Sequence, residues 1–360
     1  MKIIYVVGAR PNFMKVMPIL RVMKKYRPIK NVLVHTGQHY DKELSDIFFK
    51  DLHIPQPDIF LNVRSGSEVL QMATIMQRFE ACLVKEKPDL VVVVGDVNST
   101  IACALAANKL KIKVAHVEAG LRSFDATMPE ETNRIVTDHV SDYLFTSCKE
   151  ANQNLKREGI AANKIFYVGN VMIDSLYYAQ DLIKRYGVGN FKIPKNEYAV
   201  LTLHRPSNVD DKKSLTKLAQ IIQDVSKGVD IIYPVHPRGL KSIKQFKLEK
   251  YFQGHIHMIK PLGYLNFIQL ITHAKFVLTD SGGVQEETSV LNIPCLTLRA
   301  NTERPITLTS GTNVLVHMDK RKIFNEVNKI MRGHFKKKKV LPLWDGKTAE
   351  RIAKILTCIK

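Results

Sequence analysis

The sequence predicts an α/β protein made of two similar domains, each with a parallel sheet covered by helices. Short apolar runs rich in β-branched residues alternate with longer amphipathic stretches along the chain. This alternation is typical of parallel strands joined by helical crossovers. The rhythm restarts after residue 190, and a chain of 360 residues has the length of about two domains of ~150 residues each.

The first half contains six apolar runs that we interpret as strands and four stretches with helical spacing between them. The run at 90–94 is continuously apolar, as expected for a parallel strand that is buried on both faces. The expected strands cover 3–7, 31–35, 90–94, 113–117, 143–146 and 164–168. The expected helices cover 13–26, 68–86, 98–109 and 149–157, and a further helix opens near Pro129.

The second half repeats this pattern. We expect strands over 198–203, 230–235, 256–259, 276–279 and 295–298. Helices are expected over 211–226, 264–273, 284–291, 320–332 and, at the C-terminus, 348–359. The segment 186–196 holds two glycines and a proline, which makes it the best candidate for a linker between the domains.

Composition narrows the class of protein. The net charge of +20 favours an anionic partner, which can be nucleic acid, an acidic membrane or a phosphorylated small molecule. No zinc finger, helix-turn-helix or aromatic RNA-binding motif is evident, so we do not expect nucleic acid. No apolar run reaches the length of a membrane span. The five cysteines are widely spaced, which predicts no metal site and a reducing, cytoplasmic location.

Polar residues follow the first expected strand. The segment Gly8-Ala9-Arg10-Pro11-Asn12-Phe13-Met14-Lys15 is neither a G-x-G-x-x-G loop nor a Walker A loop, so neither a dinucleotide cofactor nor a P-loop is predicted. Arg10 and Lys15 are expected near a helix N-terminus, where an anion binds well. The alternative is a capped turn with surface cations.

Three carboxylates follow neighbouring strands or open the next helix. Asp96 comes directly after the strand at 90–94, Glu118 ends the next strand, and Glu130 begins a helix. Asp96 is equally compatible with a helix N-cap, and acidic residues are common in a first helical turn. Together the three predict acid and base groups whose pKa values are set by their surroundings.

The second half places cations and glycines after its strands. His204 and Arg205 follow one strand, and a His-Arg pair suits a diphosphate, although a single histidine is more often structural. Ser281, Gly282 and Gly283 lead into a helix, where backbone N–H groups can approach an anion. Glu287 lies one turn further and is suited to ribose hydroxyls. Arg304 follows the strand at 295–298.

With these motifs the chain resembles the non-hydrolysing UDP-N-acetylglucosamine 2-epimerases over nearly its whole length. The resemblance rests on ordered motifs at comparable spacing: Gly8-Ala9-Arg10-Pro11 with Lys15, Gly95-Asp96, residues 116–122, Pro129-Glu130-Glu131 with Asn133-Arg134, His204-Arg205, residues 280–287 and Thr302-Glu303-Arg304-Pro305.

The resemblance implies a GT-B fold, an arrangement of two Rossmann-like domains with an inter-domain cleft. One domain would cover 1–170 and be joined by a C-terminal helix at 346–360, and the nucleotide-binding domain would cover 171–345. It implies a homodimer without cofactor or metal that acts on a UDP-N-acetylhexosamine and supplies cell-surface polysaccharide synthesis. Asp96, Glu118, Glu130 and His204 would be catalytic. The substrate contacts would be Arg10, Lys15, Asp96, Glu118, His204, Arg205, Phe267, Ser281, Gly282, Gly283, Glu287 and Arg304.

The implied reaction interconverts UDP-N-acetylglucosamine and UDP-N-acetylmannosamine. UDP leaves C1 while a carboxylate takes the C2 proton, and UDP then adds back to the 2-acetamidoglycal. Two alternatives share the nucleotide site: a 2-epimerase for another UDP-2-acetamido sugar and a GT-B glycosyltransferase.

The chain departs from the family pattern at three places. Leu262 stands where some members have a glutamine that contacts the nucleotide. Tyr40 stands where many bacterial members have arginine, and Pro206-Ser207-Asn208 replaces Arg-Glu-Asn. The last two changes affect a second pocket through which substrate activates many bacterial relatives. A phenol cannot make the bidentate phosphate contact of a guanidinium, so we expect little or no substrate activation.

Overall fold

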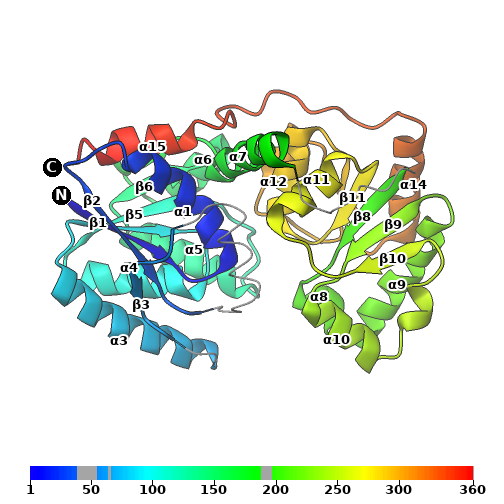
Figure 1. Ribbon diagram of the computed structural model, residues 1–360, viewed down its shortest axis with the longest axis horizontal. Coiled ribbons are helices and arrows are strands. Elements are labelled where there is room, and N and C mark those ends of the chain that lie inside the picture. Colours follow the sequence, from blue (N-terminus) through cyan, green and yellow to red (C-terminus); the bar gives the residue numbers. More distant parts are fainter. Residues whose placement is uncertain (39–54, 64–65, 188–196, 360) are drawn as a thin grey trace. The chain divides into compact units, whose positions relative to one another are not determined.

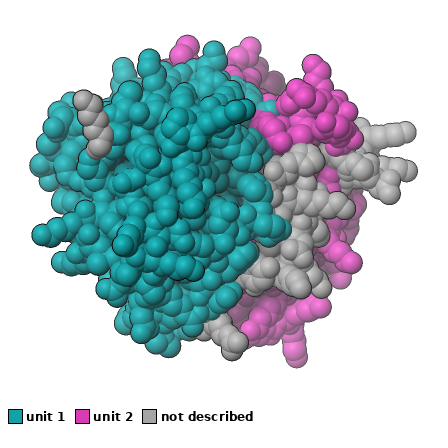
Figure 2. Space-filling view, turned by 60° about the vertical axis from the view of Figure 1, so that its left-hand side comes forward, with its two compact units in different colours: residues 1–177, 342–360 teal, residues 178–341 magenta. Residues whose placement is uncertain are grey.

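The computed structural model describes residues 1–38, 55–63, 66–187 and 197–359, except the side chain of Arg10. The chain divides into two compact units, which Figure 2 shows in two colours. Unit 1 comprises Met1–Tyr177 with Pro342–Lys360, and unit 2 comprises Tyr178–Leu341. The boundary between them falls inside a helix, a few residues after the expected position at 170.

Unit 1 is built around a parallel sheet that has seven strands among the described residues. Its strands are β1 (Lys2–Val7), β2 (Lys30–His35), β3 (Ile59–Phe60), β4 (Leu90–Val94), β5 (Lys113–Ala119), β6 (Tyr143–Thr146) and β7 (Ile165–Tyr167). Its helices are α1 (Arg10–Met23), α3 (Glu68–Glu86), α4 (Asn98–Lys109), α5 (Pro129–Val140), α6 (Lys149–Arg157), α15 (Thr348–Leu356) and the first part of α7 (Val171–Tyr186); a 3₁₀ turn covers Ala162–Lys164 (Figure 1).

Unit 2 repeats this plan with six parallel strands in the described part of the chain. They are β8 (Tyr198–Thr202), β9 (Asp230–Pro234), β10 (Ile256–Ile259), β11 (Phe276–Thr279), β12 (Cys295–Thr297) and β13 (Asn313–Leu315). The helices are α8 (Pro206–Val209), α9 (Lys212–Ser226), α10 (Pro237–Gln245), α11 (Tyr264–Thr272), α12 (Gly282–Leu291), α13 (Pro305–Thr309) and α14 (Lys320–Met331); a 3₁₀ turn covers Glu249–Tyr251.

The two sheets have the same strand order. It runs β3-β2-β1-β4-β5-β6-β7 in unit 1 and β10-β9-β8-β11-β12-β13 in unit 2. Both orders place the first strand of the unit beside the fourth, which is the Rossmann arrangement, and ligands bind where the order reverses. The predicted class of two Rossmann-like domains is confirmed. The switch points lie between β1 and β4 and between β8 and β11.

Local sequence explains most of the elements. All five residues of β4 are buried, as its uninterrupted apolar run predicts. Ser67 caps α3 by accepting from the Leu70 N–H, and Asp211 caps α9 through the Ser214 N–H. The predicted bounds of α3, α4 and α6 are confirmed. The predicted helix over 13–26 lies three residues too far along the chain. Helix α1 begins at Arg10 because Pro11 is favourable in a first helical turn.

The sequence pattern missed short elements at the edges of the sheets. Strands β3 and β13 have two and three residues, too few to display a period. Helices α8 and α13 are also short and begin at prolines.

The C-terminal segment packs into unit 1. Helix α15 contacts α1, and the Asp174 carboxylate in α7 accepts the N–H groups of Thr348 and Ala349 at 3.3 and 2.8 Å. The indole N–H of Trp344 donates to the Ser147 carbonyl at 2.9 Å. These bonds hold the first turn of α15 and the segment before it to the unit in which the chain begins. In the described part of the chain, no helix has the length and apolarity that crossing a bilayer requires.

Candidate active site

The loop between β1 and α1 is fastened to the end of β4. The Asn12 carboxamide accepts from the backbone N–H groups of Gly8 and Ala9 and donates to the Val94 carbonyl at 3.0 Å. A Cβ on Gly8 would lie 2.0 Å from the Ser99 hydroxyl oxygen, so only glycine fits there. The backbone of Arg10 opens α1, but its side chain lies outside the described part of the protein.

Lys15 and Glu118 form a buried ion pair at the carboxyl ends of β1 and β5. Lys15 Nζ lies 2.8 Å from Glu118 Oε2, and the side chains are 7% and 5% exposed. Glu118 has a φ of +72°, and the register between β5 and β6 shifts between Val117 and Ala119. A left-handed glutamate in a strand is strained, and such strain concentrates at functional sites.

Asp96 forms an ion pair with Arg134 of α5, a residue that is remote from it in the sequence. Its Oδ2 lies 2.6 Å from Nη2 of Arg134 in α5, and Arg134 also pairs with Glu131 at 2.6 Å. The N-cap residue of α4 is Val97, so the interpretation of Asp96 as a helix N-cap was wrong. Arg134 fixes the Asp96 carboxylate at the end of β4, where the side chain remains partly exposed.

Beneath these groups lies a buried network centred on Asp138 of α5. Its carboxylate receives His116 Nδ1 at 2.7 Å, Arg122 Nη1 at 2.8 Å and the Gly120 N–H at 3.0 Å. Burial alone would raise the pKa of Asp138, but the His116 and Arg122 contacts outweigh it and hold that pKa below its ordinary value. His116 Nε2 lies 2.8 Å from the Gly95 carbonyl, so the network fixes the residue that precedes Asp96.

Glu130 lies in the first turn of α5, beside Glu131. It is partly exposed. Its neighbour Glu131 is buried and accepts the N–H groups of Ser123 and Phe124. Burial acts to raise the pKa of Glu131, and these bonds with the charge of Arg134 lower it overall. Glu131 therefore orders the loop before α5, while Glu130 remains accessible.

The buried face of α5 is polar, which sequence reasoning missed. Glu131, Arg134 and Asp138 have the spacing i, i+3, i+7 and are all buried. Residues at this spacing share one face of a helix, and the buried face of an ordinary helix is apolar. The sequence signal that could have identified this network is the row of charged residues at positions of α5 where an apolar face is expected. Asp138 and Arg134 were not among the predicted site residues.

In unit 2, His204 is held by Asp280 at the switch point between β8 and β11. His204 Nδ1 lies 2.8 Å from Asp280 Oδ1; the Asp280 side chain is fully buried, and that of His204 is 43% exposed. Arg205 follows, and its Nε donates to the Asp280 carbonyl at 3.1 Å. Asp280 was quoted in a motif but was not predicted as a site residue.

Helix α12 begins at the glycines of the predicted anion site. Gly282 and Gly283 occupy its first turn, and Ser281 precedes them. The Arg304 guanidinium lies against Gly282, because a Cβ there would come within 2.5 Å of Arg304 Nη1. Arg304 Nε also pairs with Glu286 at 2.8 Å, and Nη1 contacts Glu303. The guanidinium is therefore fixed beside the N-terminus of α12.

Glu287 and Phe267 lie on the neighbouring helices α12 and α11. Glu287 is buried, and its Oε1 accepts the Tyr264 hydroxyl at 2.9 Å. Phe267 is partly buried. Tyr264 was not predicted from the sequence, where it is one apolar residue of an amphipathic helix.

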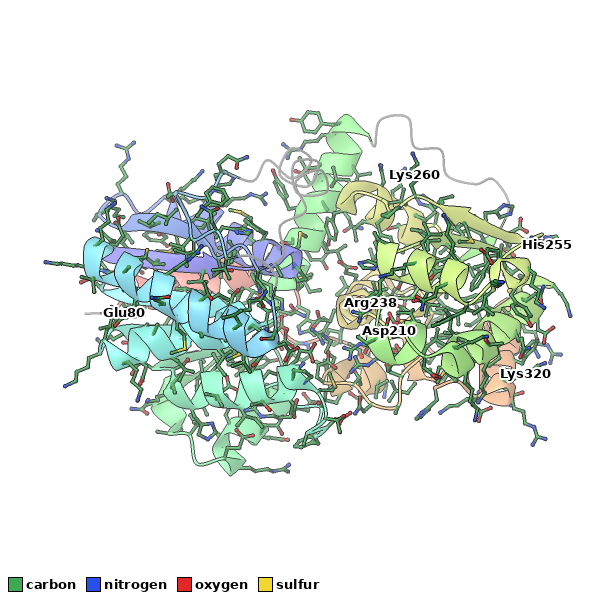
Figure 3. The ribbon with its side chains drawn as sticks, turned by 90° about the horizontal axis from the view of Figure 1, so that it is seen from below. Glu80, Asp210, Arg238, His255, Lys260 and Lys320 are labelled. Atoms are coloured by element: carbon green, nitrogen blue, oxygen red, sulfur yellow. The ribbon has the colours of Figure 1, made fainter. Side chains whose placement is uncertain are left out.

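Of the positions at which the chain departs from the family pattern, the structure describes Leu262 and residues 206–208. Residues 40–43 lie outside the described ranges. Pro206, Ser207 and Asn208 form α8, whose C-cap Asp210 pairs with Arg238 of α10 at 2.5 Å (Figure 3). Leu262 is partly exposed just before α11.

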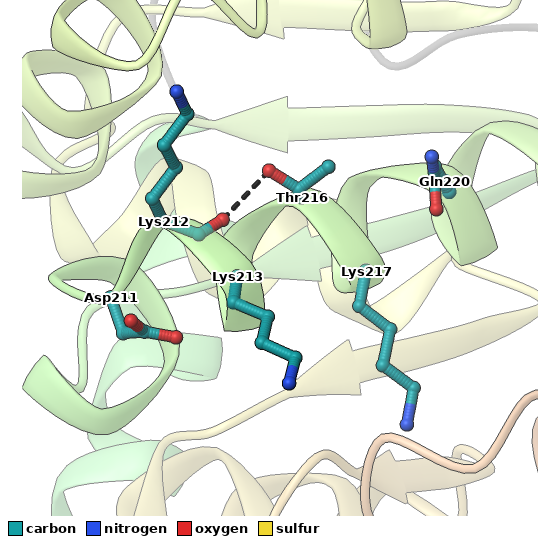
Figure 4. Close-up of a pocket in the computed structure, with 6 residues that line it drawn as sticks. All are labelled: Asp211, Lys212, Lys213, Thr216, Lys217 and Gln220. Atoms are coloured by element: carbon teal, nitrogen blue, oxygen red, sulfur yellow. Dashed lines mark hydrogen bonds between the residues drawn. The ribbon is translucent and has the colours of Figure 1, made fainter.

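A surface hollow of about 570 Å³ lies along the exposed side of α9. It is lined by Asp211, Lys212, Lys213, Thr216, Lys217 and Gln220 (Figure 4). None of the predicted site residues borders it. In the described ranges, no three His, Cys, Asp or Glu side chains are grouped so that they could hold a metal ion.

Comparison with known proteins identifies the family. Residues 21–357 match the family model described as UDP-N-acetylglucosamine 2-epimerase. The UDP-N-acetylglucosamine 2-epimerase of Methanocaldococcus jannaschii is 44% identical over 365 residues, which cover 99% of both chains. Its crystal structure in complex with UDP-GlcNAc and UDP matches with a TM-score of 0.92 and 43% identity, over 99% of each chain.

A second relative has a different printed substrate. The UDP-2,3-diacetamido-2,3-dideoxy-D-glucuronate 2-epimerase of Pseudomonas aeruginosa is 42% identical over 320 residues, covering 88% of each chain. The family match spans most of the sequence. The chain belongs to the UDP-N-acetylglucosamine 2-epimerase family.

Proposed function

We propose that the protein is an isomerase that reversibly epimerises C2 of UDP-N-acetylglucosamine to give UDP-N-acetylmannosamine. The observation that carries the proposal is the pair of carboxylates at the ends of adjacent strands, each in an ion pair with a cation: Glu118 with Lys15 and Asp96 with Arg134. Family membership and the relatives' printed names support the same activity.

The proposed chemistry proceeds by elimination and re-addition. The C1–O bond to UDP breaks and its electron pair leaves with UDP, while a carboxylate removes the C2 proton and the C1=C2 bond forms. A UDP oxygen then attacks C1 as C2 receives a proton on the opposite face. Asp96, Glu118 and Glu130 supply the proton transfers and face the positive charge that develops at C1.

The residues of unit 2 suit the leaving diphosphate. A helix N-terminus with two glycines presents N–H groups to an anion, and Arg304 is fixed against Gly282. His204 and Arg205 add cationic donors at the end of β8. We propose that these groups, with Arg10, stabilise UDP as it leaves, and that Phe267 and Glu287 contact the nucleoside.

The experiment is turnover in D₂O without added NAD or metal. Solvent deuterium is expected at C2 of UDP-N-acetylmannosamine, detected by proton NMR. Product that carries no deuterium at C2 would refute the proton-abstraction mechanism, and the absence of any epimer would refute the substrate.

A UDP-2,3-diacetamido sugar is the second candidate substrate. The observation that favours it is the 42% identity to the Pseudomonas enzyme, which is close to that of the Methanocaldococcus relative. Parallel kcat/KM measurements on the two nucleotide sugars decide between them.

We further propose a homodimer that works in the cytoplasm and supplies polysaccharide synthesis. Val69 and Leu70 near the start of α3 are 79% and 62% exposed, and contiguous exposed apolar side chains favour a protein contact. Light scattering on the purified protein and on a Val69→Ser/Leu70→Ser variant tests the assembly: a dimer that the substitutions leave intact would exclude this face.

A further inference from the structure

We infer that Asp280 is a positioning residue for the reaction, holding His204 with its proton on Nδ1 and its Nε2 directed away from the carboxylate. The inference rests on the proposed function for the role of His204. The inference goes beyond the proposed function because it assigns the orientation of His204 to Asp280, a residue to which that proposal gives no role.

The contacts of His204 determine which ring nitrogen carries the proton. Its Nδ1 lies 2.8 Å from Asp280 Oδ1, and its own backbone N–H donates to both carboxylate oxygens at 3.1 Å. An ionised carboxylate only accepts hydrogen bonds, so Nδ1 must carry the proton. Backbone and ring are thus bound to the same group, which fixes the side-chain rotamer.

Asp280 is itself held from several sides. It accepts the Arg205 N–H at 3.0 Å and the Asn208 carboxamide N–H at 3.1 Å. Burial acts to raise the pKa of Asp280, but the contacts with His204 and Arg205 outweigh it and keep that pKa below its ordinary value. The aspartate therefore stays charged, although none of its surface is exposed.

The two residues come from strands that are neighbours only in the folded sheet. His204 follows β8 and Asp280 follows β11, and these strands pair in parallel. Their carboxyl ends meet at the switch point, where ligands bind in this fold. Asp280 faces the interior of unit 2, and His204 keeps 43% of its side chain exposed.

This arrangement suits stabilisation of a departing diphosphate. With Nδ1 bound to Asp280, Nε2 is the ring nitrogen that can meet an anion, and a ring that is protonated there donates a charge-assisted hydrogen bond. An imidazole with its proton on Nε2 alone and a bare Nδ1 could donate but would lack the charge-stabilising partner. Asp280 thereby sets the direction of the His204 ring and the nitrogen that it presents to the anion.

A neighbouring histidine provides an internal reference. The His236 ring lies 6.2 Å from that of His204, measured between centroids, and His236 Nδ1 accepts the Arg238 N–H at 3.2 Å. Neutral His236 therefore carries its proton on Nε2, the opposite tautomer. The two rings should give distinct patterns in one spectrum.

The first experiment is long-range ¹H–¹⁵N NMR of the full-length protein labelled with ¹⁵N-histidine, with His204→Gln and His236→Gln used for assignment. We expect His204 with a protonated Nδ1 and His236 with a bare Nδ1. A neutral His204 with its proton on Nε2 would overturn the inference. This measurement needs no turnover, so it stands even if the proposed reaction fails.

The second experiment compares Asp280→Asn with Asp230→Asn. Asp230 pairs with His255 at 2.8 Å in the same unit, but it lies at the start of its strand, whereas Asp280 follows the end of β11. The side chains of Asp230 and His255 are both partly exposed, so a change at this pair should be tolerated (His255 is labelled in Figure 3). We expect Asp280→Asn to lower kcat roughly 10- to 100-fold with a smaller change in KM, and to alter the His204 pattern. Asp230→Asn should alter His255 and its neighbour His257, whose Nε2 lies 3.9 Å from Asp230, and should leave the His204 pattern and kcat unchanged.

Unchanged kcat and an unchanged His204 pattern in Asp280→Asn would refute the positioning role. If the variant is unstable, the wild-type spectrum still decides the tautomer. Absence of epimerase activity in the wild-type protein, with the expected tautomer present, would refute the proposed function and leave the geometry of the pair intact.

Discussion

Lys15 Nζ and Glu118 Oε2 lie 2.8 Å apart, and both side chains are almost fully buried. The pair joins helix α1 to a left-handed residue of β5. A charge buried with its partner is tolerated, whereas removal of one partner leaves the other uncompensated.

We predict that Lys15→Met destabilises the protein by about 3–5 kcal/mol and abolishes most turnover, because Glu118 loses its counter-ion. Urea unfolding measures the first effect and an epimerisation assay the second. Lys15→Met/Glu118→Gln removes both charges and should recover much of the stability but not the activity. A double variant as unstable as Lys15→Met would contradict the ion-pair explanation.

We predict that Asp96→Asn, Glu118→Gln and Glu130→Gln each fold but lose turnover by about 10²–10⁴-fold, the usual contribution of an acid–base group. The matched control is Asp89→Asn, since Asp89 lies at the other end of β4, where it accepts the Lys2 N–H. Circular dichroism verifies folding. Near-normal kcat in all three variants would show that the carboxylates are misassigned.

We predict that Glu287→Ala and Arg304→Ala mainly weaken UDP binding, by about 10- to 100-fold, as expected for a lost hydrogen bond to a charged group. Arg304 also balances Glu286 and Glu303, so Arg304→Lys is needed as a variant that retains the charge. Tyr264→Phe removes a donor to Glu287 but keeps its carboxylate. Calorimetry with UDP measures each affinity, and unchanged values in the first two variants would remove both residues from the site.

We predict that Asp174 makes the docking of α15 sensitive to pH. Burial raises the pKa of Asp174 from 3.8 to about 6, against the opposing bonds from Ala349 and Thr348. The folded state then holds this proton more tightly than the unfolded chain does. The resulting stabilisation, of the order of 3 kcal/mol, is complete below about pH 4 and is lost as the pH rises through about 6.

The probe for this effect is the single tryptophan, Trp344, which is buried against Ser147 in the same segment. Urea unfolding followed by its fluorescence should show the wild-type protein losing stability relative to Asp174→Asn between pH 4.5 and 7. A difference between the two proteins that does not change with pH would contradict the assignment to Asp174.

We predict little or no activation by substrate. The resemblance implies that Tyr40 and Pro206 stand where many bacterial relatives have cations of a second pocket, and Asp41 and Glu43 would add negative charge there. The initial rate from pure UDP-N-acetylmannosamine, with and without a trace of UDP-N-acetylglucosamine, measures the effect. A lag that the trace abolishes would demonstrate a working second site.

The sequence by itself determined the class of fold and the segments to which we assign the proposed chemistry. Its apolar periods define most strands and the long helices, because hydrophobic spacing is a local property. The motifs after the strands located Asp96, Glu118, His204 and Ser281–Gly283, since parallel sheets expose polar groups at their carboxyl ends.

Only the tertiary structure decided which side chains hold these groups. Strand order brings β8 beside β11, which joins His204 to Asp280 across 76 positions of sequence, and the packing of α5 brings Arg134 to Asp96. The sequence also left Asp96 open as a helix cap, an interpretation that the observed cap at Val97 excludes. Ion pairing depends on distances of a few ångströms between remote residues, and no local period encodes them.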